Sequence, residues 1–325
     1  MMNNRDRFRQ TLLYGIPDRI TYFENEIHRN VIARWRQQGL ASIRQLRETF
    51  PVDVYEEIEP QLNPLPPIYP WSAEQSILDK LQKRLNRNNP LHLPANWFKL
   101  KKLGTQLQQV LILVVHQGFF LSLGVGDWQS FDLLIGQLRE NRPLIRRWLE
   151  IYGEFAAQLA DKILNRVKVD AALFNEPIGG LTGSLISPVM YRELVLPGYK
   201  PILDVLARYH IPLIIFRTYA NARLLLPEVL KAGMNCLWAY ECNDQQMNYV
   251  QLRREFGRDL SLIGGIDLDA LRQNKTAICN EIEEKVPALL AAGGYLPAAD
   301  GRIREDVSFE NYVFYRELLK KYIKI

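Results

Sequence analysis

The sequence has few cysteines, no long apolar run and no glycine fingerprint of a nucleotide site, and each absence excludes a class of protein. Three cysteines in 325 residues cannot build a disulfide framework, so we expect a reducing, cytoplasmic setting. The longest apolar run, Val110–Val115, is far shorter than the roughly 18 residues of a membrane span, and we expect no membrane association. The glycines of Gly179–Ser184 lack both the lysine of a phosphate-binding loop and the spacing of a dinucleotide site.

The net charge of +5 is dispersed along the chain and is not gathered into a basic stripe. The 41 lysines and arginines alternate with 36 aspartates and glutamates. The densest basic stretches, Lys80–Arg87 and Lys99–Lys102, are typical of solvated faces. Nucleic-acid binding needs a basic surface that follows the phosphate backbone, so we expect no nucleic-acid partner.

From residue 110 onward, short apolar runs alternate with helical segments. Strands that are apolar throughout are buried on both faces, which is typical of a parallel sheet covered by helices. Together with Ile20–Phe23 and Val52–Val54, these runs give eight candidate strands. The pattern predicts an α/β fold, namely a (β/α)₈ TIM barrel. We expect a single domain over residues 1–325, which includes an N-terminal helical segment of about residues 1–15. The runs are Val110–Val115, Asp170–Phe174, Pro212–Phe216, Met234–Ala239, Leu260–Ile266 and Gly294–Pro297.

The residues at the carboxyl ends of these strands are the candidate site, because active sites of such barrels lie there. The set is rich in acids and has one arginine and one histidine, which suits acid–base chemistry or a polar ligand. Its members are Glu24, Glu26, Asp53, His116, Glu176, Arg217, Tyr219, Glu241, Cys242, Asp267 and Asp300.

Several ordered motifs resemble the uroporphyrinogen decarboxylase superfamily of (β/α)₈ barrels. The opening Arg-Asp-Arg-Phe helix leads into Gly-Ile-Pro-Asp-Arg-Ile at 15–20, and Leu-Ile-Gly-Gly-Ile-Asp ends a strand at 262–267. The central Ser-Leu-Ile-Ser-Pro motif spans 184–188, and the terminal Gly-Gly-Tyr-Leu-Pro and Asp-Val-Ser-Phe-Glu-Asn-Tyr motifs lie at 293–297 and 306–312. Taken together, these motifs cover the chain from end to end.

The resemblance implies one of two activities. Uroporphyrinogen decarboxylases remove acetate carboxyls from a tetrapyrrole without a cofactor. The related cobamide-linked methyltransferases use a zinc-bound thiol to carry a methyl group between a corrinoid and a thiol. Either activity implies a small-molecule substrate, the second adds a corrinoid protein as partner, and a homodimer is compatible with both.

The sequence departs from both family patterns. Where the decarboxylases carry an arginine-rich loop, this chain has Glu24 and Glu26, which would repel a polycarboxylate, and Gly301 replaces the terminal histidine. The zinc ligands of the methyltransferases are missing from 216–219 and 298–304. We therefore expect neither a metal nor a cofactor.

The resulting hypothesis is acid–base chemistry on a carboxylate-bearing or tetrapyrrole-type small molecule. Arg217 would orient an anionic group, and Glu176 or Asp267 would transfer protons. Two alternatives stay open: Arg217 neutralises Glu176 or Glu241, and Asp267 caps the helix that follows it. The expected substrate-binding residues are Glu24, Glu26, His116, Tyr219, Glu241, Tyr295 and Asp300.

Two rival functions remain. One is a corrinoid-linked methyltransferase or demethylase component. The other is a barrel without catalysis that binds a corrinoid or a partner protein, as the missing family residues would suggest. The two classes differ in one respect: an enzyme should bring acids with shifted pKa values into one pocket.

Overall fold

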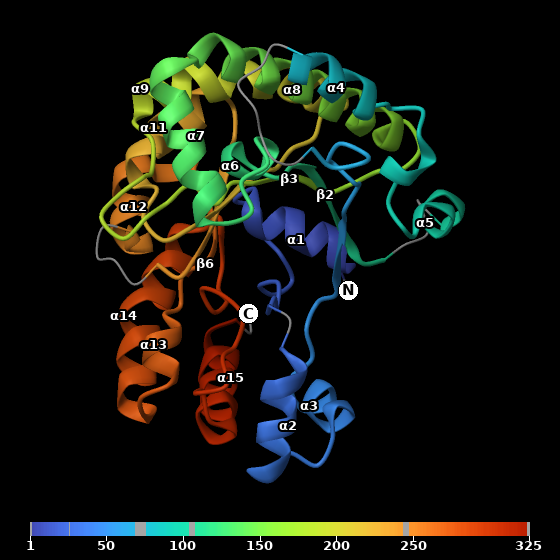
Figure 1. Ribbon diagram of the computed structural model, residues 1–325. Coiled ribbons are helices and arrows are strands. Elements are labelled where there is room, and N and C mark those ends of the chain that lie inside the picture. The colour runs from blue at the N-terminus through green and yellow to red at the C-terminus, as the bar shows by residue number, and fades with distance from the viewer. Residues whose placement is uncertain (1, 26, 69–75, 104–107, 243–246, 324–325) are drawn as a thin grey trace.

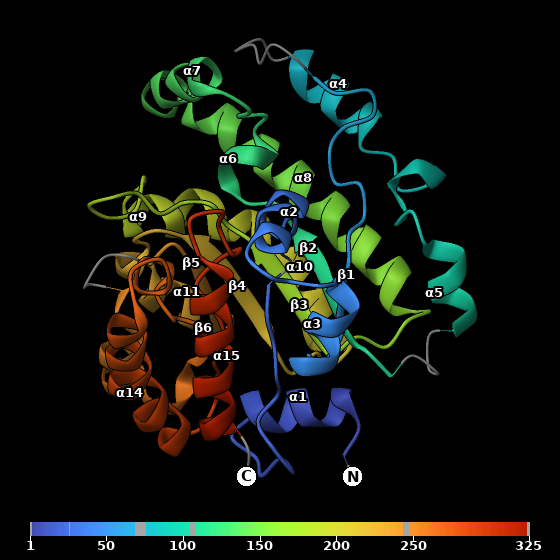
Figure 2. The same cartoon turned by 90° about the horizontal axis from the view of Figure 1, so that it is seen from below.

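Seven parallel strands form one curled sheet in the computed structural model, which describes residues 2–25, 27–68, 76–103, 108–242 and 247–323. Each strand pairs with its neighbour in the sequence, so the order runs from β1 to β7, and helices surround the sheet (Figures 1 and 2). The strands are β1 Tyr55–Ile58, β2 Val110–His116, β3 Ala171–Asn175, β4 Ile214–Tyr219, β5 Cys236–Tyr240, β6 Ser261–Gly264 and β7 Tyr295–Leu296.

At least one helix follows each strand from β2 onward, as the predicted alternation of apolar runs and helical segments requires. Helices α8 and α10 approach so closely that a Cβ atom on Gly153 would lie 1.8 Å from the carbonyl oxygen of Gly198, which fixes glycine at this contact. Within the described residues, no helix is long and apolar enough to cross a membrane. The helices are α1 Asn4–Leu12, α2 Arg29–Gln37, α3 Ile43–Thr49, α4 Ser76–Arg84, α5 Trp97–Leu103, α6 Phe119–Ser122, α7 Trp128–Glu140, α8 Arg142–Leu164, α9 Pro188–Met190, α10 Leu196–Arg208, α11 Leu226–Lys231, α12 Tyr249–Phe256, α13 Leu268–Leu271, α14 Lys275–Ala292 and α15 Phe309–Ile323.

The predicted strands from residue 110 onward are confirmed as β2 to β7, but the two earlier predictions are wrong. Ile20–Phe23 is not a strand, and the strand predicted at Val52–Val54 begins three residues later, at Tyr55. The reason is that side chains satisfy the backbone of the first segment. The carboxylate of Asp53 accepts the Tyr22 N–H at 2.7 Å, and the Thr11 hydroxyl accepts the Thr21 N–H at 3.4 Å.

Residues 20–25 nevertheless lie between the two edges of the sheet and connect them. The Asp53 N–H donates to the Tyr22 carbonyl at 2.7 Å, just before β1. On the other side, the Asn25 amide donates to the carbonyl of Ala299, which follows β7, at 3.1 Å. The structure is therefore barrel-like, with seven strands in its described part and an irregular segment where an eighth would lie.

A buried cluster around Asp53 holds this segment in place. The Asp53 carboxylate pairs with Arg7 at 3.1 Å and with Arg19 at 2.7 Å, in addition to its bond from Tyr22. Only 3 % of the Asp53 side chain is exposed, so two guanidiniums and a backbone donor replace the water it has lost.

We expect Asp53→Asn to lower the free energy of unfolding by about 1.5–3 kcal/mol, because Arg7 and Arg19 lose their charged bonds to this carboxylate while Arg7 keeps its second partner, Asp18. Urea unfolding followed by circular dichroism measures the change. Asp204→Asn is the matched control: its partner Lys200 and its own side chain are exposed, and the cost should stay below about 1 kcal/mol. Equal losses in the two variants would contradict the role given to Asp53.

Candidate functional site

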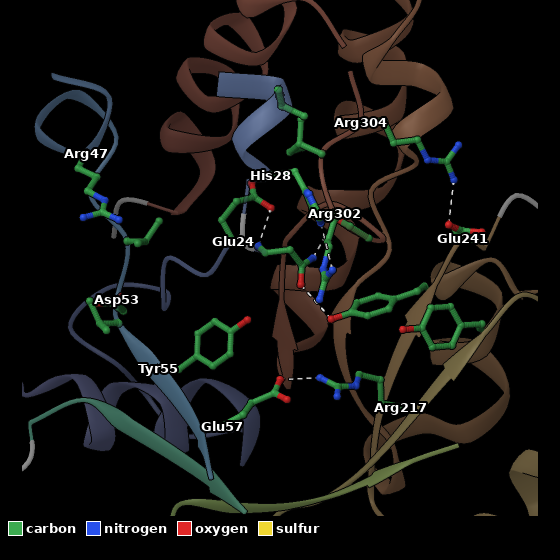
Figure 3. Close-up of a pocket in the computed structure, with 18 of the residues that line it drawn as sticks. Glu24, His28, Arg47, Asp53, Tyr55, Glu57, Arg217, Glu241, Arg302 and Arg304 are labelled. Carbon is green, nitrogen blue, oxygen red and sulfur yellow. Dashed lines mark hydrogen bonds and ion pairs between the residues drawn. The ribbon is translucent and has the colours of Figure 1, made fainter. Parts of the chain in front are cut away.

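A pocket of about 1190 Å³ opens at the carboxyl ends of the strands (Figure 3). Its walls come from the segment before α2, the chain around β1, the ends of β4 and β5, and the loop after β7. Its charged and polar lining residues are Glu24, Asn25, His28, Arg47, Asp53, Tyr55, Glu57, Glu59, Arg217, Tyr219, Tyr240, Glu241, Arg302, Arg304 and Glu305.

Arg217, near the end of β4, is fixed by side chains from two other strands of the sheet. Its Nη1 donates to Glu57 of β1 at 2.5 Å, and its Nε donates to Asn175 of β3 at 3.1 Å. The guanidinium also lies 5.3 Å from the centre of the Trp238 ring. Burial acts to lower the pKa of Arg217, but the Glu57 carboxylate raises it above the ordinary value, so the side chain stays charged.

The structure corrects the predicted partners of Arg217. The sequence left Glu176 or Glu241 as its counter-charge, whereas the observed partner is Glu57. Glu241 instead pairs with Arg304 at 3.1 Å (Figure 3). Glu241 has a φ of 54°, a left-handed conformation that a non-glycine residue rarely adopts, and such outliers gather at functional sites.

Glu24 lines the pocket while its carboxylate is bound from behind. The Tyr315 hydroxyl donates to Oε2 at 3.0 Å, and the buried Arg316 lies 3.4 Å from the same oxygen. Burial raises the pKa of Glu24, although the Arg316 guanidinium opposes this rise. The repulsion expected from Glu24 is thus reduced by an internal cation.

Four of the residues predicted to act in catalysis or substrate binding line this pocket together: Glu24, Arg217, Tyr219 and Glu241; Asp53, a further strand-end candidate, lines it as well. Glu26 falls outside the described residues. The other five lie away from the pocket lining, and their roles stay predictions.

Glu176 and His116 are buried at the ends of β3 and β2. The Phe119 N–H donates to Glu176 Oε1 at 2.8 Å, and the Tyr199 hydroxyl donates to the other oxygen. Burial raises the pKa of Glu176 to about 7 and lowers that of His116 to about 3. The His116 ring packs between Tyr152 and Tyr199, with ring centres 4.9 and 4.4 Å apart.

Tyr295 and Asp267 bond to nearby backbone. The Tyr295 hydroxyl donates to the Gly264 carbonyl at 3.0 Å. Asp267 caps α13, since its Oδ1 accepts the Asp269 N–H at 2.7 Å, which confirms the capping alternative for this residue.

Asp300 is buried after β7 and connects two other loops. Its carboxylate oxygens accept the Cys242 N–H at 2.8 Å and the Leu268 N–H at 3.2 Å. Its backbone carbonyl accepts the Glu241 N–H at 2.6 Å. Burial raises the pKa of Asp300 to about 7. Asp300 therefore positions Glu241, and with it Arg304, from outside the pocket.

The sequence alone missed the other cations of the pocket. Arg302 and Arg304 lie shortly after Asp300 in the chain. Including the next few residues after that strand end among the candidates would have identified them. Arg47 comes from α3, which was not predicted. In Figure 3, Arg47 and Arg304 lie on opposite sides of the pocket with Arg302 between them. These side chains add positive charge to the pocket lining.

The described residues contain no group of three or more histidine, cysteine, aspartate or glutamate side chains placed to hold a metal ion. The fold and the pocket define an α/β barrel-like protein with a charged cavity at its strand ends. The model of the uroporphyrinogen decarboxylase family matches residues 126–322, more than half of the chain. The chain therefore belongs to the uroporphyrinogen decarboxylase family.

Comparison with curated proteins finds no significant match. Among solved structures, phosphonopyruvate hydrolase in complex with oxalate and Mg²⁺ is 12 % identical, with a TM-score of 0.33 and 99 % and 89 % of the two chains covered. For 2,3-dimethylmalate lyase the identity is 10 %, the TM-score 0.34 and the coverage 98 % and 87 %. For a GH26 β-mannanase from Bacteroides ovatus the identity is 12 %, the TM-score 0.33 and the coverage of the two chains 88 % and 92 %. We draw no conclusion from likenesses of this size.

The raised pKa of Asp300 predicts a pH-dependent stability. An unfolded aspartate has a pKa of about 4, so the folded state holds its proton more tightly. The stability that Asp300 contributes is fully present below about pH 4 and is lost as the pH rises to about 7, by up to about 1.4 kcal/mol per pH unit. Urea unfolding at several pH values should show this slope in the wild type and a flatter one in Asp300→Asn.

Asp132→Asn is the control, because Asp132 is exposed on α7. The free energy of unfolding of this variant should change with pH as steeply as that of the wild type. An unchanged slope in Asp300→Asn would show that Asp300 is ionised in both states throughout this range.

Proposed function

We propose that the protein binds a small molecule carrying carboxylate groups in this pocket and acts on it as a decarboxylase-like enzyme. The observation that supports this best is the Arg217–Glu57 pair, which faces the pocket with 11 % and 15 % of its side chains exposed. Arginine binds carboxylates through a planar fork of N–H donors, and a fork already held in place loses little freedom on binding. Family membership supports an enzyme of the decarboxylase or methyltransferase kind.

The acids of the pocket do not rule out an anionic ligand, because most are already paired. Glu57 pairs with Arg217, Glu241 with Arg304, and Glu24 with Arg316. Arg47 and Arg302 balance the two remaining glutamates, Glu59 and Glu305. Three tyrosines add apolar ring faces that suit a flat or cyclic ligand body: Tyr55, Tyr219 and Tyr240.

Decarboxylation breaks the bond between the carboxyl carbon and its neighbour, releases CO₂ and leaves a carbanion that takes up a proton. Arg217 would hold a carboxylate that stays on the substrate. We assign the proton to Glu24, the pocket-lining carboxyl whose pKa burial raises. Glu176 and Asp267, the acids first predicted for this step, do not line the pocket.

Binding without turnover is the second candidate. Glu176 and Asp300, whose pKa values burial raises to about 7, do not line the pocket, and Glu24 is bound by Tyr315 and Arg316. A barrel that binds a corrinoid or another cyclic acid would need the cations and rings of the pocket but no proton donor. A corrinoid-linked methyl transfer is the outcome to test if decarboxylation fails.

Anaerobic incubation with uroporphyrinogen III, followed by separation of products by carboxyl count, tests the proposal. We expect loss of carboxyl groups with the wild type. Arg217→Met should lower kcat/KM by about a hundredfold, because the substrate carboxylate loses its charged partner and Glu57 loses its own.

Arg208→Met is the matched control, since Arg208 is an exposed arginine on α10 whose side chain is 63 % accessible. Its activity should equal that of the wild type. Unchanged carboxyl counts with a folded wild type would refute the decarboxylase. Tight binding of the substrate in the same experiment would then favour the binding barrel.

A further inference from the structure

Glu176 joins three elements that meet behind the pocket. It follows directly after β3, and its carboxylate accepts hydrogen bonds from the Phe119 N–H at the start of α6 and from the Tyr199 hydroxyl of α10. The side chain is fully buried. Its two acceptor oxygens therefore hold the end of β3 against both helices.

The same end of β3 holds Arg217. Asn175, the residue before Glu176, accepts the Arg217 Nε–H at 3.1 Å. The Glu176 N–H donates to the Arg217 carbonyl at 2.6 Å. The side chain and the backbone of Arg217 are thus both bound by the two residues at this strand end, and a shift of one would move the other.

Helix α10 is the fixed side of this arrangement. Its Gly198 carbonyl lies so close to Gly153 of α8 that no side chain fits between the helices. Just before α10, the chain takes a wide π-helical turn over Tyr191–Val195, a feature found often at functional sites. The close packing of α10 on α8 restricts movement of α10, so we expect a change in the bonds of Glu176 to act on the end of β3.

Glu176 is bound by Tyr199, and the rings packed around Tyr199 are aromatic and carry no positive charge at neutral pH. His116 from β2 and Tyr191 from the π-helical turn pack on Tyr199, and Tyr152 from α8 packs on His116. Burial keeps the pKa of His116 at about 3, so the ring is neutral. The buried hydroxyls of Tyr152 and Tyr191 have no hydrogen-bond partner among the described residues.

The two protonation states of Glu176 make different demands on these groups. The ionised carboxylate accepts from both donors that point at it, which is the observed geometry. The neutral acid has a proton of its own to donate, and the oxygen that carries this proton is a weaker acceptor for the donor that faces it. Burial raises the pKa of Glu176 to about 7, so both states are populated near neutral pH.

We propose that Glu176 is a positioning residue whose ionised carboxylate fixes the end of β3 and thereby orients the Arg217 guanidinium toward an anionic ligand. The inference rests on the proposed function, in which Arg217 binds a carboxylate. Protonation of Glu176 releases one of its two donors and loosens the bond between Asn175 and Arg217.

The test follows the Arg217 Nε–H signal by NMR across pH 5–9 without any ligand. Arg217→Lys, which lacks the signal, assigns it. We expect the wild-type signal to move through one titration with a midpoint near pH 7, where burial places the pKa of Glu176, and the signal of Glu176→Gln to stay constant. Glu193→Gln is the control, since Glu193 is an exposed acid in the same π-helical turn, and it should titrate as the wild type.

Tyr199→Phe gives a second check that keeps Glu176. Removing the Tyr199 hydroxyl takes away a hydrogen bond that lowers the pKa of Glu176, so the midpoint should shift to higher pH. A constant wild-type signal, a titration that persists in Glu176→Gln, or an unmoved midpoint in Tyr199→Phe would each overturn the inference.

Binding of uroporphyrin III, followed by fluorescence, separates this inference from the proposed function. We expect Glu176→Gln to weaken binding about tenfold at pH 8 and Glu193→Gln to leave it unchanged. If the wild type does not bind the probe, the proposed function fails, and the NMR titration still decides whether Glu176 orients Arg217. Equal affinities of Glu176→Gln and the wild type would overturn the positioning role.

Discussion

The buried Asp53 carboxylate is the interaction on which the rest of the structure depends. No strand ladder joins β1 to the segment at 20–25, so Asp53 completes this side of the barrel through Arg7, Arg19 and the backbone of Tyr22. It also fixes the start of β1, and β1 carries Glu57 into the pocket against Arg217. A charge cluster at the edge of the sheet thereby decides where the central arginine of the site points.

The pocket combines paired charges at its surface with buried acids behind it. Arg217 and Arg304 each meet a glutamate within the pocket, and the strand ends that hold these pairs are fixed by Glu176 on one side and Asp300 on the other. Both buried acids accept backbone N–H bonds, and burial raises their pKa values to about 7. Charge is thus exposed where a ligand would bind, and groups that can lose a proton near neutral pH lie in the supporting layer.

Much of the fold could be predicted, but the site only in part. Buried parallel strands need apolar side chains on both faces, and this requirement marks β2 to β7 in the sequence. The edges of the sheet have no such mark: Thr21 and Tyr22 have strand-forming side chains, yet Thr11 and Asp53 bind their backbone. At strand ends the sequence names residues but does not show where their side chains point. It could therefore not distinguish Arg217, which lines the pocket, from Glu176, which is buried outside it.

The sequence by itself determined the α/β class, the order of the strands and membership of the uroporphyrinogen decarboxylase family, because local periodicity and ordered motifs carry this information. Only the tertiary structure decided which charges meet. Arg217 and Glu57 are 160 positions apart in the chain, and Arg316 and Glu24 are 292 apart. No local pattern encodes such pairs, since the curling of the sheet brings them together.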